Sequence, residues 1–578
     1  MKKTIYSILP IMVFILFLQA CSANDGSPIQ STILPAERKI DWGLAGVWEN
    51  GVKGIPNRTA VFCNVRVSIP GSSLVARGDG VTDDTAALQA AINGCTAGQV
   101  VYLPAGTYRI SGTLSLKSNV VVRGAGMGET TVVQYGNAHA FRLVGADSFA
   151  YTNATSGYTK NSDTIVVSDP SLFQVGDMVR MDQLNDPNLV TNVGSGGTCT
   201  WCGRYGVNGT RAMGEVALVT QISGNSIRIN RPLYHSYSSA FNPQLGRQSR
   251  NPIKYCGIEN MTIQAAAGVT SGDLVQLYTA LYCWVSGVET YSVADRHIHF
   301  SWDCYGCEVR GCYVHEAKYF DGSRGYGISL AGGTYDSLIE DNILYYLHAP
   351  IVIDSGGAGT VIGYNYSERT QLSQPSWFIY HMGTHGSHPF MNLFEGNVTG
   401  KVDTDSYWGS GSHNVFFRNR ITRENLGQPV TSDLVAVIVE ALNYHITFVG
   451  NILGTPGCAG PVEQIPLVGT NMNPVLWKIG YAGAATGYPT DPKVAQTLIK
   501  TGNWECPTNA VQWDPNISDR TIPDSLYLTS KPGWFGILTW PPFTPERSGF
   551  NPANVNKIPA QVRFESGLGL SYIPARGY

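Results

Sequence analysis

Histidines gather in one part of the chain, and carboxylates lie among them. Eight of the eleven histidines fall between residues 297 and 413, namely His297, His299, His315, His348, His381, His385, His388 and His413. Imidazole and carboxylate groups are the usual proton donors and acceptors of enzymes. A lone histidine is more often a structural residue. Eight of them in one stretch indicate a functional site.

Some of the carboxylates follow apolar runs that should be buried strands. Asp354 ends Ile351-Val-Ile-Asp, and Glu440 ends Val437-Ile-Val-Glu. An unpaired carboxylate is costly to bury, so these two should project outward. The candidate catalytic residues are Asp405, Glu440, Asp354, Asp321 and His381. The candidate substrate-binding residues are Trp408, His385, His388, His413, Lys318, Arg324 and Tyr326.

A repeated phrase predicts the elements that position these residues. An apolar residue, two variable residues and an Asn recur in the segments that end at Asn342, Asn365, Asn397, Asn419 and Asn451. Weaker copies end at Asn260, Val288 and Cys312. The unit is about one coil with loops of varying length inserted, which is typical of a solenoid. One Asn per coil can bond to its own backbone and to the next coil.

A second strand precedes each phrase. Apolar residues lie 14 and 12 positions before the fourth residue, as Ile298 and Phe300, Ile328 and Leu330, Ile351 and Ile353, and Val437 and Val439. This alternation predicts a strand with one face inward. Its outward residues would be His299, Val352, Asp354, Ile438 and Glu440. Asp354 and Glu440 would lie three coils apart, roughly 14 Å at about 4.8 Å per coil, too far to act as a pair. The loops between them contribute His381, His385, His388, Asp405 and Trp408.

The N-terminal third carries a family resemblance. "GDGVTDDTAALQAAI" at 78–92 and "VVYLPAGTYRISGTLSLKSNVVVRGAG" at 100–126 resemble the signature of the pectate lyase superfamily, in its rhamnogalacturonase/epimerase-like branch. The resemblance implies an all-β, right-handed parallel β-helix whose opening helix, predicted at 82–93 with Thr82 or Asp83 as N-cap, covers the open end. It also implies that substrate lies along the sheet of the alternating strands. The clustered Asp79, Asp83 and Asp84 then belong to the start of a helix.

Three chemistries fit the candidate residues. Hydrolysis of a glycan needs an acid and a base, which Asp405 with Glu440 or Asp321 with Asp354 could supply from adjacent coils. Elimination on a uronate needs a base and a cation, with Ca²⁺ held by aspartates as the one cofactor that this route would add. Metal chemistry on His381, His385 and His388 ranks third, because no helix fixes that loop. The signature is shared by hydrolases, lyases and phage tailspikes, and neither the familiar hydrolase motif set nor the usual lyase motif is present. We expect a glycoside hydrolase, with a lyase and a non-catalytic glycan-binding or scaffold protein as the alternatives.

The chain ends and its composition set the remaining expectations. Lys2 and Lys3 before an apolar run predict a signal peptide over 1–21, and Leu18-Gln-Ala-Cys21 resembles a lipobox with Cys21 as the lipidated residue. The protein is therefore expected to be exported, as an envelope lipoprotein or in secreted form, with any membrane attachment through that lipid. A net charge of −3 and only 14% charged residues argue against a nucleic-acid partner and leave a polysaccharide as the expected one. The expected segments are 22–75, first coils 76–146, an inserted β module 147–245, coils 246–455 and a C-terminal arm or cap 456–578.

Cysteines predict local cross-links. Cys199-Thr-Trp-Cys202 and Cys304-Tyr-Gly-Cys307 are two CxxC pairs, for which disulfides or free thiols are favoured over zinc because the pairs are far apart in the chain. Cys283 and Cys307 each lie five residues before the fourth position of their phrase. They are predicted to stack on adjacent coils, within disulfide range.

Overall fold

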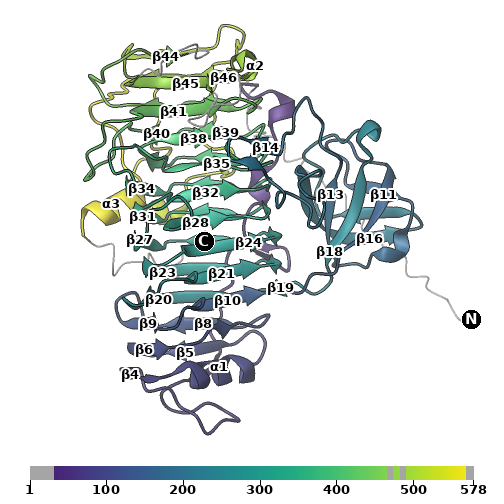
Figure 1. Cartoon of the computed structure of the whole chain (residues 1–578), viewed down its shortest axis with the longest axis vertical. Coiled ribbons are helices and arrows are strands. Elements are labelled where there is room, and N and C mark those ends of the chain that lie inside the picture. The colour runs from purple at the N-terminus through teal and green to yellow at the C-terminus, as the bar shows by residue number, and fades with distance from the viewer. Residues whose placement is uncertain (1–31, 465–472, 482–489, 568–578) are drawn as a thin grey trace, which may run out of the picture.

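The chain folds as a right-handed parallel β-helix with a small barrel inserted on one side (Figure 1). The computed structural model describes residues 32–464, 473–481 and 490–567 of the 578-residue chain. The predicted signal peptide and Cys21 lie outside the described residues. The coils stack along the vertical axis of Figure 1, and their inward side chains form one continuous apolar core.

One face of the solenoid is an 11-stranded sheet, called the long sheet below. In order along the axis its strands are β7 (Leu114–Ser115), β10 (Phe141–Val144), β21 (Val275–Tyr278), β24 (Arg296–Trp302), β28 (Tyr326–Leu330), β32 (Ile351–Asp354), β35 (Met382–His385), β38 (Val402–Thr404), β41 (Val435–Glu440), β45 (Val475–Tyr481) and β44 (Glu463–Gln464). The register pairs Ile298 with Ile328 and Ile328 with Ile351, so the predicted inward positions are confirmed.

The other faces carry the repeated phrase. Most copies of the phrase end in an Asn, and these Asn residues form a column along the axis, called the Asn column below. The strands before the Asn column include β30 (Leu338–Glu340), β33 (Val361–Gly363), β36 (Leu393–Glu395), β39 (Val415–Phe417), β42 (Thr447–Val449) and β46 (Ile499–Thr501). The strands after it include β31 (Ile343–Leu347), β34 (Tyr366–Thr370), β37 (Val398–Thr399), β40 (Arg420–Ile421), β43 (Ile452–Leu453) and β47 (Asn503–Glu505).

The Asn column is a continuous ladder of hydrogen bonds. The Nδ2 group of each residue donates to the Oδ1 atom of the next at 2.9–3.0 Å, through Asn342, Asn365, Asn397, Asn419, Asn451 and Asn503. The predicted stacking of the five phrase residues is therefore confirmed. The weak copy at Asn260 was aligned one residue out of register, because β20 (Gly257–Ala265) pairs Met261 with Val288 of β23 (Trp284–Val293).

The helix at the N-terminal end is α1 (Thr85–Gly94), beside the first coils in Figure 1. Its residues Ala87, Leu88, Ala91 and Ile92 are buried. The predicted N-cap was wrong. Asp84 occupies that position, and its carboxylate accepts from the backbone N–H groups of Arg77 and Gly78, outside the helix. Asp79 and Asp83 likewise accept from nearby backbone N–H groups, which accounts for all three aspartates structurally.

The inserted module is a closed six-stranded barrel. Its strands are β11 (Ala150–Ser156), β12 (Thr164–Val167), β17 (Ser226–Ile229), β16 (Gly214–Ser223), β13 (Met178–Asp182) and β18 (Gln244–Ser249). Buried polar contacts fix it to the solenoid. The Asp336 carboxylate accepts from Arg231 Nε at 2.7 Å and from the Tyr234 hydroxyl at 2.7 Å. The barrel therefore has a defined position beside the long sheet.

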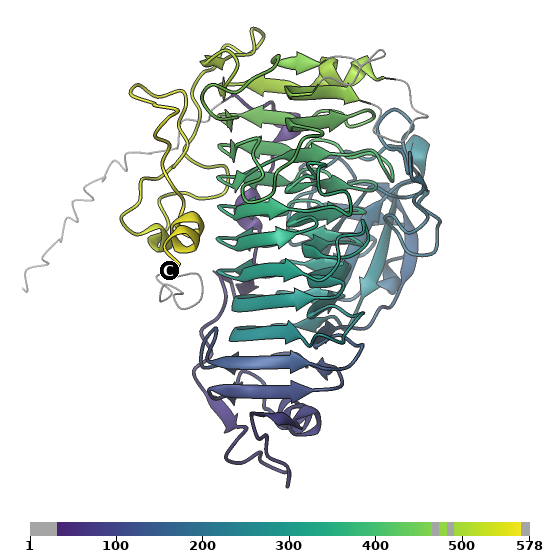
Figure 2. The ribbon, with the colours of Figure 1, turned by 60° about the vertical axis from the view of Figure 1, so that its left-hand side comes forward.

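The expected boundary between the coils and the C-terminal arm, after residue 455, was placed too early. The coils continue past residue 455, because β45, β46 and β47 form one more coil and Asn503 extends the ladder. The phrase that ends at Asn503 has Lys500 at its first position, where the five strong copies have an apolar residue. This copy was therefore not recognised in the sequence. The arm after Cys506 runs down the side of the solenoid opposite the barrel (Figure 2), where Arg418 donates to the carbonyl oxygens of Ile522 and Phe543. The last helix of its described part is α3 (Pro559–Glu565).

The cysteines confirm part of the expected pattern. Cys199 and Cys202 form a disulfide, whereas the second CxxC pair, Cys304 and Cys307, consists of buried free thiols. Cys283 and Cys307 do stack, because β23 pairs Trp284 with Glu308 of β26 (Glu308–Arg310), but both are free thiols and form no disulfide. A second disulfide, Cys458–Cys506, was not predicted.

Candidate functional site

Four polar side chains form a column on the outer face of the long sheet, one on each of four consecutive coils. Asp354 and His385 are paired residues at the ends of β32 and β35. Asp405 follows the end of β38, and Glu440 ends β41. Each follows a strand whose inward residues are apolar or Thr, so the alternation of the strand turns these four outward. We call them the Asp354–Glu440 column.

His385 and Asp405 are the centre of the column. His385 Nδ1 lies 2.6 Å from Asp405 Oδ2, and the other oxygen, Oδ1, accepts from the backbone N–H of Tyr407 at 3.0 Å. The Tyr407 ring stacks on the His385 ring at 5.8 Å. Burial opposes the charge on His385, but the carboxylates of Asp405, Asp354 and Glu440 outweigh it and raise the pKa of His385 to about 9. His385 is therefore an imidazolium at neutral pH.

The carboxylates on either side of this pair differ in their surroundings. Glu440 Oε2 accepts from the backbone N–H and the hydroxyl of Ser406, and burial next to Asp405 raises the pKa of Glu440 to about 7. Burial also raises the pKa of Asp354, against the opposing effect of His385 and Arg296. Asp354 Oδ1 is buried and has no hydrogen-bond partner among the described residues. Asp354 and Glu440 are thus the two column carboxyl groups described here whose pKa burial raises.

A buried ion cluster supports the upper end of the column. Asp433 accepts from both Lys401 and Lys478, and all three side chains are at most 5% exposed. Lys478 lies in the same outward row of the long sheet as Asp403 and Ile438. Burial beside Glu440 raises the pKa of Asp403 well above its usual range. The two lysines hold the pKa of Asp433 below its usual range, so this cluster is a fixed structural element.

Aromatic and cationic side chains lie at the lower end of the column. The Tyr326 ring contacts the His348 ring at 5.0 Å, and its hydroxyl donates to the Gly322 carbonyl. Burial, and Asp354 next, raise the pKa of Tyr326 above its usual range. On β24, His299 Nδ1 lies 2.9 Å from Asp273 Oδ2. Arg296 is the cation of this strand that influences Asp354 most.

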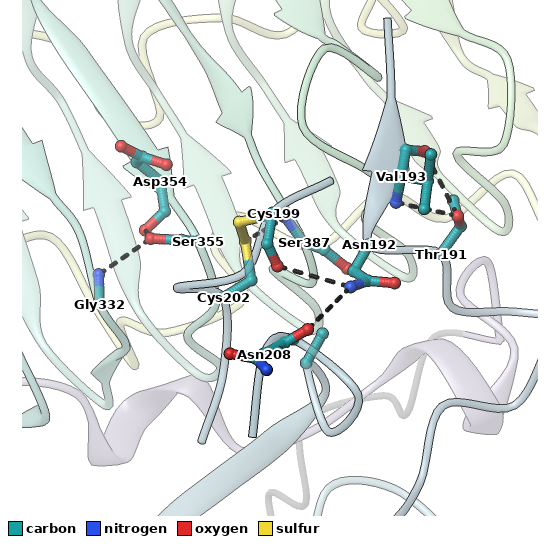
Figure 3. The surroundings of a disulfide bond; sticks show 12 residues. Thr191, Asn192, Val193, Cys199, Cys202, Asn208, Gly332, Asp354, Ser355 and Ser387 are labelled. Atoms are coloured by element: carbon teal, nitrogen blue, oxygen red, sulfur yellow. Dashed lines mark hydrogen bonds between the residues drawn. A yellow bond between two sulfur atoms is a disulfide. The ribbon is translucent and has the colours of Figure 1, made fainter. Parts of the chain in front are cut away.

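A loop of the inserted barrel borders the column on the other side. Gly196 donates to the Tyr407 carbonyl at 2.7 Å, and Thr191 and Ser410 bond through their backbones at 3.0 Å. The Cys199–Cys202 disulfide lies beside Ser387, whose N–H donates to Cys202 Sγ at 3.2 Å. Figure 3 shows this disulfide, Ser387 and Asp354 in one view. Trp408 meets Trp201 of this loop edge to face at 4.9 Å.

Several predicted site residues lie away from the column. Asp321 pairs with Arg324 at 2.7 Å in an exposed loop, so it does not join Asp354 as a second carboxylate. Lys318 Nζ donates to the carbonyl oxygens of Ala266 and Val269, a structural role. His381 is buried behind the sheet against Ser367, and burial lowers its pKa to about 3. These residues are not supported as catalytic or substrate-binding groups.

His388 and His413 belong to a different cluster. His388 Nε2 lies 2.8 Å from the Ser412 hydroxyl, and His413 Nδ1 lies 2.9 Å from the same oxygen. The His413 ring stacks on His445 at 4.6 Å and meets His235 of the barrel at 6.3 Å. Burial lowers the pKa of His388 to about 3. This cluster packs the barrel against the solenoid, so these two histidines do not form part of the column.

The histidine-rich loop does not form a metal centre. His381, His385 and His388 point to three different surroundings. Within the described ranges no three His, Cys, Asp or Glu side chains gather closely enough to hold a metal ion. The same part of the chain contains no helix that is long and apolar enough to span a bilayer.

Comparisons with known proteins match one segment of the chain to a family. Residues 72–183 match the family described as rhamnogalacturonase A/epimerase, pectate lyase-like. This segment, about a fifth of the chain, is similar to pectate lyase-like β-helix proteins. The resemblance inferred from residues 76–126 is therefore confirmed.

The similar proteins match only in part. Mannuronan C5-epimerase AlgE1 of Azotobacter vinelandii is 46% identical over 99 residues, 16% of this chain and 7% of that protein. Alginate lyase 7 of the same organism is 53% identical over 66 residues, 10% of this chain and 8% of that protein. Among solved structures, the tailspike protein gp49 from Pseudomonas phage LKA1 aligns with a TM-score of 0.46 at 17% identity, over 66% of this chain and 62% of that one. The chain thus spans less than a tenth of the length of these two curated relatives.

Sequence reasoning missed some features of the site. It named His385 as a substrate-binding group but not its pairing with Asp405, and it did not name Tyr407, Arg296 or the buried Asp433. The interval of 20 residues from His385 to Asp405, close to one coil, was the available signal. The repeated phrase does not indicate that a loop of the inserted barrel lies beside the column.

Proposed function

We propose that the protein is a polysaccharide-degrading glycoside hydrolase that acts at the Asp354–Glu440 column. The observation that carries the proposal is the arrangement of Asp354 and Asp405 on either side of His385. The backbone positions that carry the two carboxylates lie two coils apart, roughly 10 Å at about 4.8 Å per coil. Inverting glycosidases hold their two carboxyl groups about 6.5–9.5 Å apart, which leaves room for a water molecule.

The surroundings divide the roles between the two carboxylates. Burial raises the pKa of Asp354, a shift in the direction that suits the acid that protonates the leaving oxygen. Asp405 is oriented by His385 and by the Tyr407 N–H, which suits the base that activates water. Glu440 lies beside Asp405 and holds Ser406, so it acts as a positioning group. Trp408 offers an aromatic surface for a sugar ring.

A second candidate, β-elimination on a uronate-containing glycan, is favoured by one observation. Arg296 and His299 lie on the same face of the long sheet as Asp354 and the His385 imidazolium. Cations in this position could neutralise a uronate carboxylate while a base removes the adjacent proton. Curated relatives named as a mannuronan epimerase and an alginate lyase agree with this reaction class. Because they match only a short part of this chain, we place elimination second.

We also propose that the protein is exported, through the signal and lipobox predicted at residues 1–21. An exported enzyme would meet polysaccharides outside the cell. Labelling with a radioactive fatty acid, lost in Cys21→Ala, would test this part separately.

The test of the reaction is a screen of the purified protein against plant, algal and bacterial polysaccharides. Both new reducing ends and the absorbance of unsaturated uronates are measured. Reducing ends without absorbance support hydrolysis. Both signals together contradict hydrolysis and support elimination. Neither signal across a broad panel contradicts both and favours a glycan-binding or scaffold protein.

A further inference from the structure

The barrel loop that borders the column carries two unusually exposed aromatic side chains. Trp201 is 44% exposed and Tyr205 is 63% exposed. Trp201 lies between the two residues of the Cys199–Cys202 disulfide, and Tyr205 follows it in the chain. Tyr and Trp side chains are enriched at binding interfaces because they combine a large apolar ring with a polar group. The proposed reaction does not use either residue.

Each of the two meets an aromatic partner of the solenoid. Trp201 contacts Trp408, three residues after Asp405, with ring centroids 4.9 Å apart and planes at 69°. Tyr205 contacts Trp302 of β24 edge on at 5.8 Å, and one of its faces stacks on Phe149 at 5.5 Å. Trp201 and Trp408 therefore form one aromatic group and Tyr205 and Trp302 form a second. In each group one residue comes from the barrel loop and the other from the solenoid.

These two groups lie on opposite sides of the Asp354 and His385 coils along the solenoid axis. Trp302 and Trp408 are four coils apart, roughly 19 Å at about 4.8 Å per coil. The coils of Asp354 and His385 lie between them. A chain that runs along the axis across Asp354 and His385 would therefore meet one aromatic group on each side.

The loop is held before any ligand arrives. The disulfide closes its tip, Gly196 donates to the Tyr407 carbonyl, and Ser387 donates to Cys202 Sγ. A surface that is already ordered loses little conformational freedom on binding. Flat aromatic faces next to carboxylate and imidazole groups suit a ligand that has both apolar C–H faces and hydroxyl groups.

We propose that the barrel loop 199–205 is a glycan-binding surface, with Trp201 and Tyr205 each stacking on a sugar ring on opposite sides of the Asp354 and His385 coils. The occupant is one polysaccharide chain lying along the axis over at least four coils. The proposal rests on the proposed function for the identity of the column as the reaction centre. Binding itself does not depend on turnover.

The test measures binding apart from catalysis. Asp354→Asn serves as the parent, so that the polymer is not consumed. Its retardation is measured by affinity electrophoresis in gels that contain each polysaccharide of the panel. Trp201→Ala and Tyr205→Ala should each weaken binding about two- to tenfold, and the double variant should lose about the product of the two. Trp201→Phe keeps a ring and should retain more binding than Trp201→Ala.

The control is Tyr135→Ala, an aromatic residue of similar exposure, 45%, beyond the end of β9 (Thr130–Gln134) and far from the loop. It should bind like the parent. If Trp201→Ala and Tyr205→Ala also bind like the parent, or if no polysaccharide retards the parent, the inference is overturned. If the aromatic variants lose binding but the unmutated protein cleaves nothing, the inference stands and the proposed hydrolase function fails.

Discussion

The most informative perturbation is the removal of the Asp405 carboxylate from the His385–Asp405 pair. The pKa of His385 lies at about 9 against an ordinary 6.5, a difference that corresponds to about 3 kcal/mol in favour of the imidazolium. Burial alone would lower the pKa, and Asp405 is the largest contribution that raises it. Asp405→Asn keeps the shape but removes the charge. The pKa of His385 should therefore fall by at least two units, to near or below its ordinary value.

The assay is an NMR titration of the protein labelled with ¹³C at histidine Cε1. The His385 signal is assigned by its loss in His385→Gln. In the unmutated protein this signal should titrate near pH 9, above those of the buried His381 and His388. Asp321→Asn, which changes an exposed carboxylate paired with Arg324, is the matched control and should leave the titration unchanged. A His385 pKa that moves by less than half a unit in Asp405→Asn would refute this account of the column.

Three further outcomes follow from the contacts described. Because the pKa of His385 is raised, its charge stabilises the fold fully below pH 6.5, and this stabilisation is lost as pH rises through about 9. The unfolding temperature of the unmutated protein should therefore exceed that of His385→Gln by more at pH 6 than at pH 10. A difference in unfolding temperature that grows with pH would contradict this expectation. Asn397→Ala removes four hydrogen bonds of the buried ladder, at about 0.5–1.5 kcal/mol each, so chemical denaturation should show a loss of about 2–6 kcal/mol, against little for the exposed Asn516→Ala. Equal midpoints would show that the ladder adds nothing. Trp408→Ala should raise KM several-fold and change kcat less, and a fall in kcat alone would argue against a stacking role.

The repeat made most of the solenoid predictable. A fixed period of two along the strand and one Asn per coil define which side chains face inward, so Asp354 and Glu440 could be placed on the outer face from the sequence. The prediction failed where the turn length changes. Met382 lies 15 residues before Asn397, and Val402 lies 17 before Asn419, against 14 for Ile351 before Asn365. Counting back from the Asn therefore could not place His385 or Asp405.

The remaining errors have a shared cause, because they concern contacts between segments far apart in sequence. His381 and His385 are four residues apart, yet one packs behind the sheet and the other joins the column. Trp201 reaches Trp408 only because the inserted barrel docks on the solenoid through Asp336. No periodicity encodes such docking. A family signature confined to the N-terminal third reports the fold and leaves the chemistry of the later coils open.

The central claim is that Asp354 and Asp405 perform the chemistry together. The most direct measurement is the turnover of Asp354→Asn and Asp405→Asn on the polysaccharide that the unmutated protein cleaves, with Asp321→Asn as the control and circular dichroism to verify folding. The account predicts that each of the two column variants loses at least about a hundredfold in kcat, the scale of a positioned acid or base, while Asp321→Asn keeps its rate. Near-normal turnover in folded Asp354→Asn or Asp405→Asn would contradict the account and remove the column from the mechanism.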